Sequence, residues 1–271
     1  MPLATADIQL VRELVAQRSG NQLSTAQGYL IEARLQPVAQ RAGLPNVELL
    51  IAELRRSKTA KLQDSVTEAM TINETSFFRD QHPFEALRES ILPKLIESRR
   101  IGKQLSIWCA ASSCGQEPYS IAMLLKEHFP QLANWKMRIV ATDLSDEMLR
   151  KSADGVYNQF EVNRGLPAKL LMKYFDRCGA YWQLKAEVRR MVEFRKLNLT
   201  HPWHMSSYDI VFLRNVLIYF DAATKAEIIG RVHRVLRPDG FLFLGGGESI
   251  LDPNLPFRRE KIAKTVCYRP L

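Results

Sequence analysis

The stretch IWCAASSCGQEPYSIAMLL, from Ile107 to Leu125, decides the fold. It opens as an apolar strand, passes through a run of small residues and closes as a helix that begins near Glu117. Strand, tight loop and helix in this order are typical of the first unit of a nucleotide-binding α/β sheet. The G-x-G-x-x-G pattern of dinucleotide sites is absent. The stretch therefore predicts a ligand that lies close to the loop without a pyrophosphate-binding glycine turn.

Apolar runs and helical patterns alternate from about residue 81 to residue 271, which predicts a doubly wound, Rossmann-like parallel sheet. The expected strands are Leu105–Cys109, Met137–Thr142, Asp209–Leu213, Phe241–Leu244 and the tail KTVCYRPL. The expected helices are Pro83–Arg99, Glu117–Phe129, Asp146–Ala153 and Ala222–Leu236, the last closed by the turn RPDG. Residues 155–196 interrupt the alternation. The helix PAKLLMKYF and the β-rich GAYWQLKAEVRRMVEF predict a small inserted β-subdomain there.

Residues 1–70 predict a separate all-α domain of short amphipathic helices. Gly20 and Gly43 are expected to end the first two helices, and Asn46 and Thr59 to cap the next two. Pro37 should kink or interrupt the second helix. The inward stripes are Ile8, Val11, Leu14 and Val15; Ile31, Leu35, Val38 and Ala42; Val47, Leu50, Ile51 and Leu54; and Leu62, Val66 and Met70. Residues 71–80, TINETSFFRD, are expected to form a linker that packs on the rest and contributes to the active site.

The net charge of +9 lies entirely beyond residue 80, because the first 80 residues hold equal numbers of acidic and basic side chains. A basic surface favours acidic partners: nucleic acid, anionic lipid or an acidic protein. No apolar run reaches the length of a membrane span, and the N-terminal stretch lacks the apolar core of a secretory signal. The four scattered cysteines are expected to be free thiols in a reducing compartment. We therefore expect a cytoplasmic protein.

Polar residues at the ends of the expected strands indicate the ligand, because open α/β sheets bind at that edge. Glu117 stands at a helix N-terminus, where a carboxylate would repel a pyrophosphate and attract an ammonium group. S-adenosylmethionine carries an ammonium and a sulfonium and no phosphate, so it suits this loop better than NAD or ATP. Asp143 follows the second strand, either as a partner of ribose hydroxyls or as the cap of the next helix. Arg214, Asn215 and Tyr219 follow the third.

Six segments, in order, carry a resemblance that covers almost the whole chain. They are MTINETSFFRD, CAASSCGQEPYSIAM, ATDLSDEML, FRKLNL, DIVFLRNVLIYFD and RPDGFLFLGGGES. Together they resemble the CheR family, the chemotaxis receptor glutamate methyltransferases. The resemblance implies transfer of a methyl group from S-adenosylmethionine to receptor glutamates, with S-adenosylhomocysteine as product and no metal.

The same resemblance implies roles for individual residues. The linker, the loop after the first strand, the second strand tip, the segment LNL and the pair RN would contact the cofactor. These cofactor-binding residues are Asn73, Thr75, Arg79, Glu117, Asp143, Asn198, Leu199, Arg214 and Asn215. Arg79 and Tyr219 would be the catalytic residues.

The implied partners are the cytoplasmic domains of transmembrane chemoreceptors, with the enzyme recruited to receptor arrays at the inner membrane. The helical domain would recognise the receptor, with Arg34 and Arg41 as its obvious basic residues. Two departures stand out. Cys114 and Gln116 replace residues common in the family, and the turn in DRCGAYW is shorter than the glycine-rich turn with which some members bind a receptor tether. Whether this chain binds a receptor C-terminal tether therefore stays open on the sequence alone.

Other functions remain open on the sequence alone. A nucleic-acid methyltransferase would suit the positive charge, yet the [ND]-P-P-[YF] motif of base-amino methyltransferases is replaced by RNVL. A cofactor-binding regulatory module without turnover is a second alternative. A nicotinamide dehydrogenase is disfavoured by the missing glycine pattern and by Glu117. His201 and His204 stand without further ligands, so no metal site is expected. We expect a monomer, because no exposed apolar stripe stands out.

Overall fold

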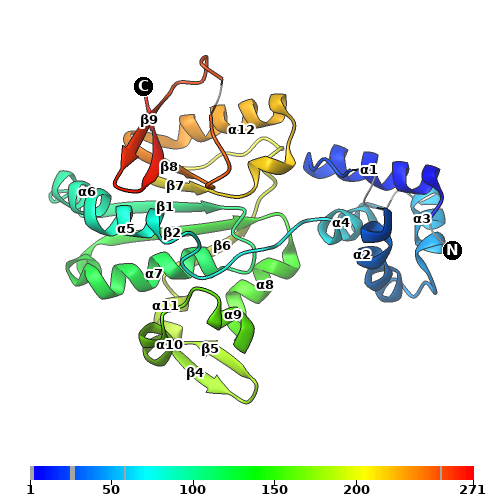
Figure 1. Ribbon diagram of the computed structural model, residues 1–271, viewed down its shortest axis with the longest axis horizontal. Coiled ribbons are helices and arrows are strands. Elements are labelled where there is room, and N and C mark those ends of the chain that lie inside the picture. Colours follow the sequence, from blue (N-terminus) through cyan, green and yellow to red (C-terminus); the bar gives the residue numbers. More distant parts are fainter. Residues whose placement is uncertain (1–2, 25–27, 58, 251) are drawn as a thin grey trace. The chain divides into compact units, whose positions relative to one another are not determined.

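The computed structural model describes residues 3–24, 28–57, 59–250 and 252–271 (Figure 1). The chain divides into two compact units. The first comprises Met1–Ile72 with two later segments, Asn198–His201 and Tyr219–Lys225. The second comprises Asn73–Leu197, Pro202–Ile218 and Ala226–Leu271. The two units are described separately.

The first unit is all-α, as predicted. Its helices are α1 (Thr5–Ser19), α2 (Gly28–Arg41), α3 (Val47–Arg56) and α4 (Ala60–Ala69). Gly20 ends α1 in the left-handed conformation, at a φ of 73°. Asn46 caps α3 by accepting a hydrogen bond from the amide of Leu49 at 2.9 Å, which satisfies an N–H that the helix leaves unpaired. Apolar side chains of all four helices form one core.

Pro37 does not interrupt α2, so of the two expected effects of this proline, a kink or an interruption, the interruption was wrong. The helix runs through it from Gly28 to Arg41. Proline removes one backbone donor and leaves the carbonyl of Ala33 without its helical partner. Both Pro37 and Ala33 lie on the exposed side of α2, where water satisfies that carbonyl. The buried side chains of Ile31, Leu35, Val38 and Ala39 hold the helix on the other face. Ala42, expected to face inward, is exposed.

Two segments from late in the chain belong to this helical unit. The side-chain amide of Asn198 donates to the carbonyl of Arg18 at 2.6 Å, and the backbone amide of Gln22 donates to the carbonyl of Tyr219 at 2.9 Å. A methyl group on Gly20 would approach Thr200 to 2.7 Å. The end of α1 is thus packed against residues 198–201 and 219–225, which the sequence did not group with it.

The second unit is built on a seven-stranded sheet in the order β6-β2-β1-β7-β8-β10-β9. Its strands are β1 (Gln104–Ala110), β2 (Lys136–Asp143), β6 (Val192–Lys196), β7 (Tyr208–Leu213), β8 (Leu236–Leu244), β9 (Phe257–Ile262) and β10 (Thr265–Pro270). The five strands from β6 to β8 run parallel, and β10 is antiparallel to both of its neighbours. This confirms the predicted doubly wound sheet.

Helices precede and connect the parallel strands (Figure 1). They are α5 (His82–Ala86), the π-helical turn η2 (Leu87–Ile91), α6 (Leu92–Ser98), α7 (Gln116–His128), the 3-10 turn η3 (Pro130–Asn134), α8 (Asp146–Asp154) and α12 (Ala222–Val235). The expected helix over Pro83–Arg99 therefore contains a wide turn in its middle. Successive side chains of β1, from Ile107 to Ala110, are all at most 1% exposed, so both faces of the sheet are covered.

The inserted subdomain is smaller than predicted. Its sheet has the order β3-β5-β4, formed by β3 (Val156–Asn158), β4 (Phe175–Cys178) and β5 (Tyr181–Leu184). The short helices α9 (Gln159–Asn163), α10 (Ala168–Tyr174) and α11 (Ala186–Arg189) accompany it (Figure 1). The boundary at residue 196 was wrong, because β6 leaves the subdomain and pairs in parallel with β2 in the main sheet.

Two further differences concern the last strands. The segment RPDG does not close α12 as a separate turn. It forms an irregularity inside β8, between the pairs Tyr208↔Leu236 and Ile210↔Phe241. The strand β9 was not predicted. Its sequence FRREKI is rich in charge because it lies at the edge of the sheet, where only β10 pairs with it.

The linker is fixed to the subdomain by an aromatic anchor. Phe77 is fully buried and meets Tyr157 and Phe175 edge-on, with ring centroids 5.1 and 5.7 Å away. Gly165 lies directly against its backbone: a Cβ on Gly165 would stand 2.1 Å from the carbonyl oxygen of Phe77. Gly165 also has a φ of +88°, a conformation that side chains disfavour. Only glycine fits between linker and subdomain at this point.

Replacing Gly165 with alanine is therefore expected to destabilise the second unit. The left-handed backbone costs about 1–2 kcal/mol and the clash with Phe77 about 1–3 kcal/mol more. Gly179→Ala is the matched control, since Gly179 has a φ of +60° and nothing within 4 Å of its added methyl group. Urea unfolding of both variants measures the difference. Equal losses of unfolding free energy would show that the contact with Phe77 is not tight.

Candidate functional site

The loop after β1 is held in a contorted shape by its neighbours. Ala111 and Ser113 have positive φ angles of 55° and 50°. The amide of Ser112 donates to the carbonyl of Thr142 at 2.9 Å, and the hydroxyl of Ser152 in α8 donates to the carbonyl of Ser113 at 2.9 Å. A Cβ on Gly115 would meet the Ser152 hydroxyl at 2.9 Å. The small residues therefore let the loop pack onto β2 and α8.

Asp143 ends β2 and connects it to this loop. One carboxylate oxygen accepts the amide of Ser113 at 2.7 Å and the other accepts the amide of Ser145 at 3.0 Å. The cap of α8 is Ser145, whose hydroxyl accepts the amide of Met148. The alternative that Asp143 caps the helix was therefore wrong.

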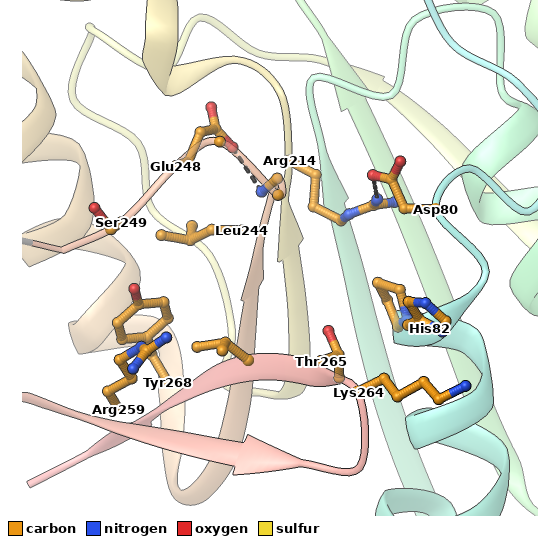
Figure 2. Close-up of a pocket in the computed structure, with 15 residues that line it drawn as sticks. Asp80, His82, Arg214, Leu244, Glu248, Ser249, Arg259, Lys264, Thr265 and Tyr268 are labelled. Atoms are coloured by element: carbon orange, nitrogen blue, oxygen red, sulfur yellow. Dashed lines mark hydrogen bonds and ion pairs between the residues drawn. The ribbon is translucent and has the colours of Figure 1, made fainter.

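Arg214 directly follows β7, and its side chain donates three hydrogen bonds. Its guanidinium donates to Glu117 at 2.7 Å, to Asp80 at 2.7 Å and to the carbonyl of Arg79 at 3.1 Å. Its side chain is 2% exposed. Figure 2 shows it reaching from the strand end to Asp80. One residue thus connects the central strand, the N-terminus of α7 and the linker.

The carboxylate of Glu117 lies in a nearly dry environment. Its side chain is 12% exposed, against 50% for Asp80. Burial raises the pKa of the Glu117 carboxyl group, while the charges of Arg214 and Arg79 act in the opposite direction. A second cation beside Glu117 would relieve part of this desolvation. The carboxylate therefore still favours a positively charged ligand, although Arg214 already occupies one of its oxygens.

The linker lies along the same loop and strand ends. The carbonyl of Asn73 accepts the hydroxyl of Ser113 at 2.8 Å. The amide of Phe78 donates to the hydroxyl of Ser120 in α7 at 2.9 Å. The guanidinium of Arg79 donates to the carbonyl of Glu74 at 2.8 Å and stays partly exposed. Thr75 is partly buried between these anchors. The structure therefore brings Arg79 close enough to Glu117 for its charge to lower the pKa of that carboxyl group, and it places Asn73 against the loop after β1.

Glu248 is a structural residue that the sequence reading missed. One of its oxygens accepts the amides of Asn215 and Gly245, each at 2.7 Å, and the other accepts the amide of Ile218 at 3.3 Å. Asn215 has a φ of 57°. Glu248 therefore fixes the turns after both β7 and β8. The signal was present in the acid that directly follows the three glycines of GGGES.

The remaining predicted residues fall in the first unit. The side chain of Asn198 donates to the Arg18 carbonyl and accepts the amide and hydroxyl of Thr200 at 3.0 and 2.8 Å. Leu199 is buried and Tyr219 is half-buried. The structure thus does not group Asn198, Leu199 and Tyr219 with Glu117 and Asp143, and the geometry of the site described above is that of the second unit alone.

Two kinds of structure are absent from residues 3–24, 28–57, 59–250 and 252–271. No helix in these ranges is long and apolar enough to cross a membrane. No group of three or more His, Cys, Asp or Glu side chains in them is placed to hold a metal ion.

Models of two domains of one protein family match the chain. The all-alpha domain of CheR methyltransferases matches residues 6–71, and their S-adenosylmethionine-binding domain matches residues 73–266. The chain belongs to the CheR methyltransferase family. It is an S-adenosylmethionine-dependent methyltransferase by this membership.

Curated relatives agree with the family over nearly the full length. The chain is 40% identical to chemotaxis protein methyltransferase 1 of Pseudomonas aeruginosa, with 99% of each chain covered. It is 38% identical to chemotaxis protein methyltransferase Cher2 of Pseudomonas putida, with 92% of each covered. It is 36% identical to a chemotaxis protein methyltransferase of Vibrio parahaemolyticus, covering 91% of this chain and 90% of the relative.

The residues of this CheR-family site fit an adenosyl cofactor. Ser112 has a buried hydroxyl with no hydrogen-bond partner in the described part of the chain, which suits a polar ligand atom. Asp143 presents a buried carboxylate at the end of β2, a group type that suits ribose hydroxyls, and Glu117 suits an ammonium group. The small loop residues allow close approach to the backbone. These three side chains would hold the cofactor in the second unit.

Arg214→Met is expected to lower the unfolding free energy by about 3–5 kcal/mol, because it leaves the carboxylate of Glu117 buried without a partner. Asp80→Asn removes the exposed partner of the same arginine and should cost less than about 1 kcal/mol. The double variant Arg214→Met, Glu117→Gln should recover part of the loss. Denaturant unfolding measures all three. If the Arg214→Met variant were as stable as Asp80→Asn, the buried pair of Arg214 and Glu117 would not contribute more to the unfolding free energy than the exposed contact with Asp80.

Proposed function

We propose that this protein transfers the methyl group of S-adenosylmethionine to glutamate side chains of chemotaxis receptors. The products would be glutamate methyl esters and S-adenosylhomocysteine. The observation that carries the proposal is the likeness over the full chain to relatives named chemotaxis protein methyltransferases. The site supports it independently, because Arg79 offers a partly exposed guanidinium near Glu117, and a guanidinium suits an incoming carboxylate.

The chemistry requires alignment rather than acid–base catalysis. A glutamate with a pKa of about 4.3 is ionised at neutral pH and is already a nucleophile. The bound cofactor supplies the methyl group and a sulfur that accepts the electron pair of the broken C–S bond. A carboxylate oxygen forms the new C–O bond, and no proton moves. The chain must orient the two reactants, which can contribute up to about 7–11 kcal/mol in the best model systems.

Each predicted residue has a role in this proposal. Arg79 would hold the receptor carboxylate through a charge-assisted hydrogen bond. Glu117 would hold the ammonium group and Asp143 the ribose hydroxyls. Asn73, Thr75, Asn198, Leu199, Arg214 and Asn215 would border the cofactor. Tyr219 would place its ring or hydroxyl beside the sulfonium as an aromatic–cation contact.

The buried thiols support direct transfer. Burial raises the pKa of Cys109 and of Cys114, the two cysteines nearest the loop after β1. A raised pKa disfavours the thiolate, which is the reactive form of cysteine. A covalent methyl-cysteine route, which a nucleic-acid methyltransferase can use, therefore has no suitable nucleophile in this loop.

The proposed substrate also assigns a place and partners. The protein would act in the cytoplasm at receptor arrays, as a monomer, with the helical unit contacting the receptor. Arg34 donates to the carbonyl of Thr71 at 2.8 Å and so has a structural partner. Arg41 is exposed and carries no ion pair within the described ranges. Arg41 is therefore the better candidate for receptor contact.

Labelled methyl groups test the reaction. Purified protein with methyl-labelled S-adenosylmethionine is expected to label receptor protein in chemoreceptor membranes, and mild alkali should release the label because it sits in carboxyl esters. Arg79→Ala and Tyr219→Phe should each lower turnover at least ten-fold. The control is Arg100→Ala, which removes an exposed arginine of the second unit.

The cofactor affinity of each variant is measured separately by calorimetry. Near-normal turnover in both variants, with cofactor affinity intact, would remove Arg79 and Tyr219 from catalysis. Label on RNA or DNA instead of receptor would overturn the substrate assignment.

The affinity for S-adenosylmethionine is expected to depend on pH through Glu117. The carboxylate must be ionised to hold an ammonium group, and burial raises its pKa. Affinity should therefore fall as the pH drops through that raised value, beginning above the usual range of a carboxyl group. Glu117→Gln should bind about ten-fold more weakly at pH 7.5 and lose this pH dependence. Glu85→Gln, at a half-exposed acid, should keep it. A pH profile unchanged by Glu117→Gln would contradict the role.

A further inference from the structure

A pocket of about 410 Å³ opens beside Arg214 in the second unit. Figure 2 shows it between the loop after β8 and the hairpin of β9 and β10, with Asp80 and His82 along one side. It lies at the strand ends β8 and β10, whereas Glu117 and Asp143 belong to the ends of β1 and β2. Of the residues given a role toward the cofactor or the methyl acceptor, Arg214 alone also lines this hollow.

The pocket carries excess positive charge. Its two acids already have partners: Glu248 accepts three backbone amides, and Asp80 is paired with Arg214. Arg259 and Lys264 line the pocket, and neither side chain has a hydrogen-bond or ion-pair partner among the described residues. In Figure 2 Arg259 lies beside Tyr268 and Lys264 beside Thr265, on opposite sides of the hollow. Arg214, Arg259 and Lys264 outnumber Asp80 and Glu248 among the lining residues, so a ligand between Arg259 and Lys264 would meet a net positive charge.

Backbone donors and an apolar floor complete the pocket. Gly246 and Gly247 are exposed, have open space around them, and neither N–H has a partner in the part of the chain that the structure describes. Glu248 holds this loop in place through Gly245. Exposed amides of a fixed loop are suited to bind anions. Leu244 and Tyr268 add apolar surface.

We propose that this pocket binds a small phosphate-bearing molecule. Two cations and two neighbouring amides match the charge and the compact acceptor oxygens of a phosphate group. The volume lies in the range of small-molecule sites, about 300–1,000 Å³. The apolar floor leaves room for a nucleoside or a similar uncharged part. This site goes beyond the proposed methyl transfer and does not depend on it.

Calorimetry tests the proposal on the full chain. The protein is first saturated with S-adenosylhomocysteine, so that a nucleotide cannot enter the adenosyl site, and is then titrated with inorganic pyrophosphate and with ADP. Both should bind, and more weakly at higher salt. Equal affinities would mean that phosphate alone is recognised, and tighter ADP binding that the apolar floor holds the nucleoside. Failure to bind S-adenosylhomocysteine would count against the cofactor assignment alone.

Matched variants locate the site. Arg259→Gln and Lys264→Gln should each weaken pyrophosphate binding about ten-fold or more. Arg258→Gln removes the same charge from the residue that precedes Arg259 in β9. Successive side chains of a strand point to opposite sides, so this variant should leave pyrophosphate binding unchanged. Loss of the same size in all three would mean non-specific attraction. No binding at millimolar pyrophosphate would overturn the proposal. So would variants that raise the KM for receptor while leaving pyrophosphate affinity intact, since the pocket would then serve the substrate.

Discussion

The second unit depends on one buried guanidinium. Arg214 stands at the end of the central strand β7 and bonds Glu117 on α7, Asp80 in the linker and the carbonyl of Arg79. Three segments that are far apart in the sequence therefore meet at one charge. Removing two ions from water is costly, and the attraction between Arg214 and Glu117, with the two further acceptors of Arg214, offsets part of that cost. The same contact sets the electrostatics of the site, because the charge of Arg214 opposes the rise in pKa that burial causes in Glu117.

The linker is a structural part of the site because contacts along its length hold it to the rest of the second unit. Phe77 anchors it in the subdomain, Phe78 and Asn73 are bonded to α7 and to the loop after β1, and Arg214 holds its end. Phe78 and Asp80 of this segment, and Gln81 directly after it, adopt positive φ angles although none of them is glycine. Such strain persists only where surrounding contacts impose it. The position of Arg79 is thus set by the packing on both sides of it.

The sequence predicted the sheet and placed Glu117 and Asp143 after its first two strands. The prediction failed where the local pattern was ambiguous. The loop from Ala110 to Gly115, followed by Glu117, could be predicted as a ligand-binding loop. A run of small residues between a strand and a helix is typical of a loop that a ligand approaches closely. The segment MVEFRK, which contains β6, alternates like a hairpin strand, and only its pairing with β2 shows that it belongs to the main sheet. Arg214 was expected to border the cofactor; its burial and its three bonds depend on segments distant in sequence. Glu248 could not be found from periodicity, since its partners are backbone amides. The roles of the cofactor and catalytic residues stay predictions.

The path of the chain between β2 and β6 has a consequence for how such enzymes diversify. These strands are adjacent and parallel, and α8 together with the three-stranded sheet forms the crossover between them. Both ends of the crossover are therefore fixed by the core, while its middle can change in length at small entropic cost. The turn between β4 and β5 can therefore change in length, whereas Tyr157, Gly165 and Phe175 must keep the contacts that anchor the linker at Phe77.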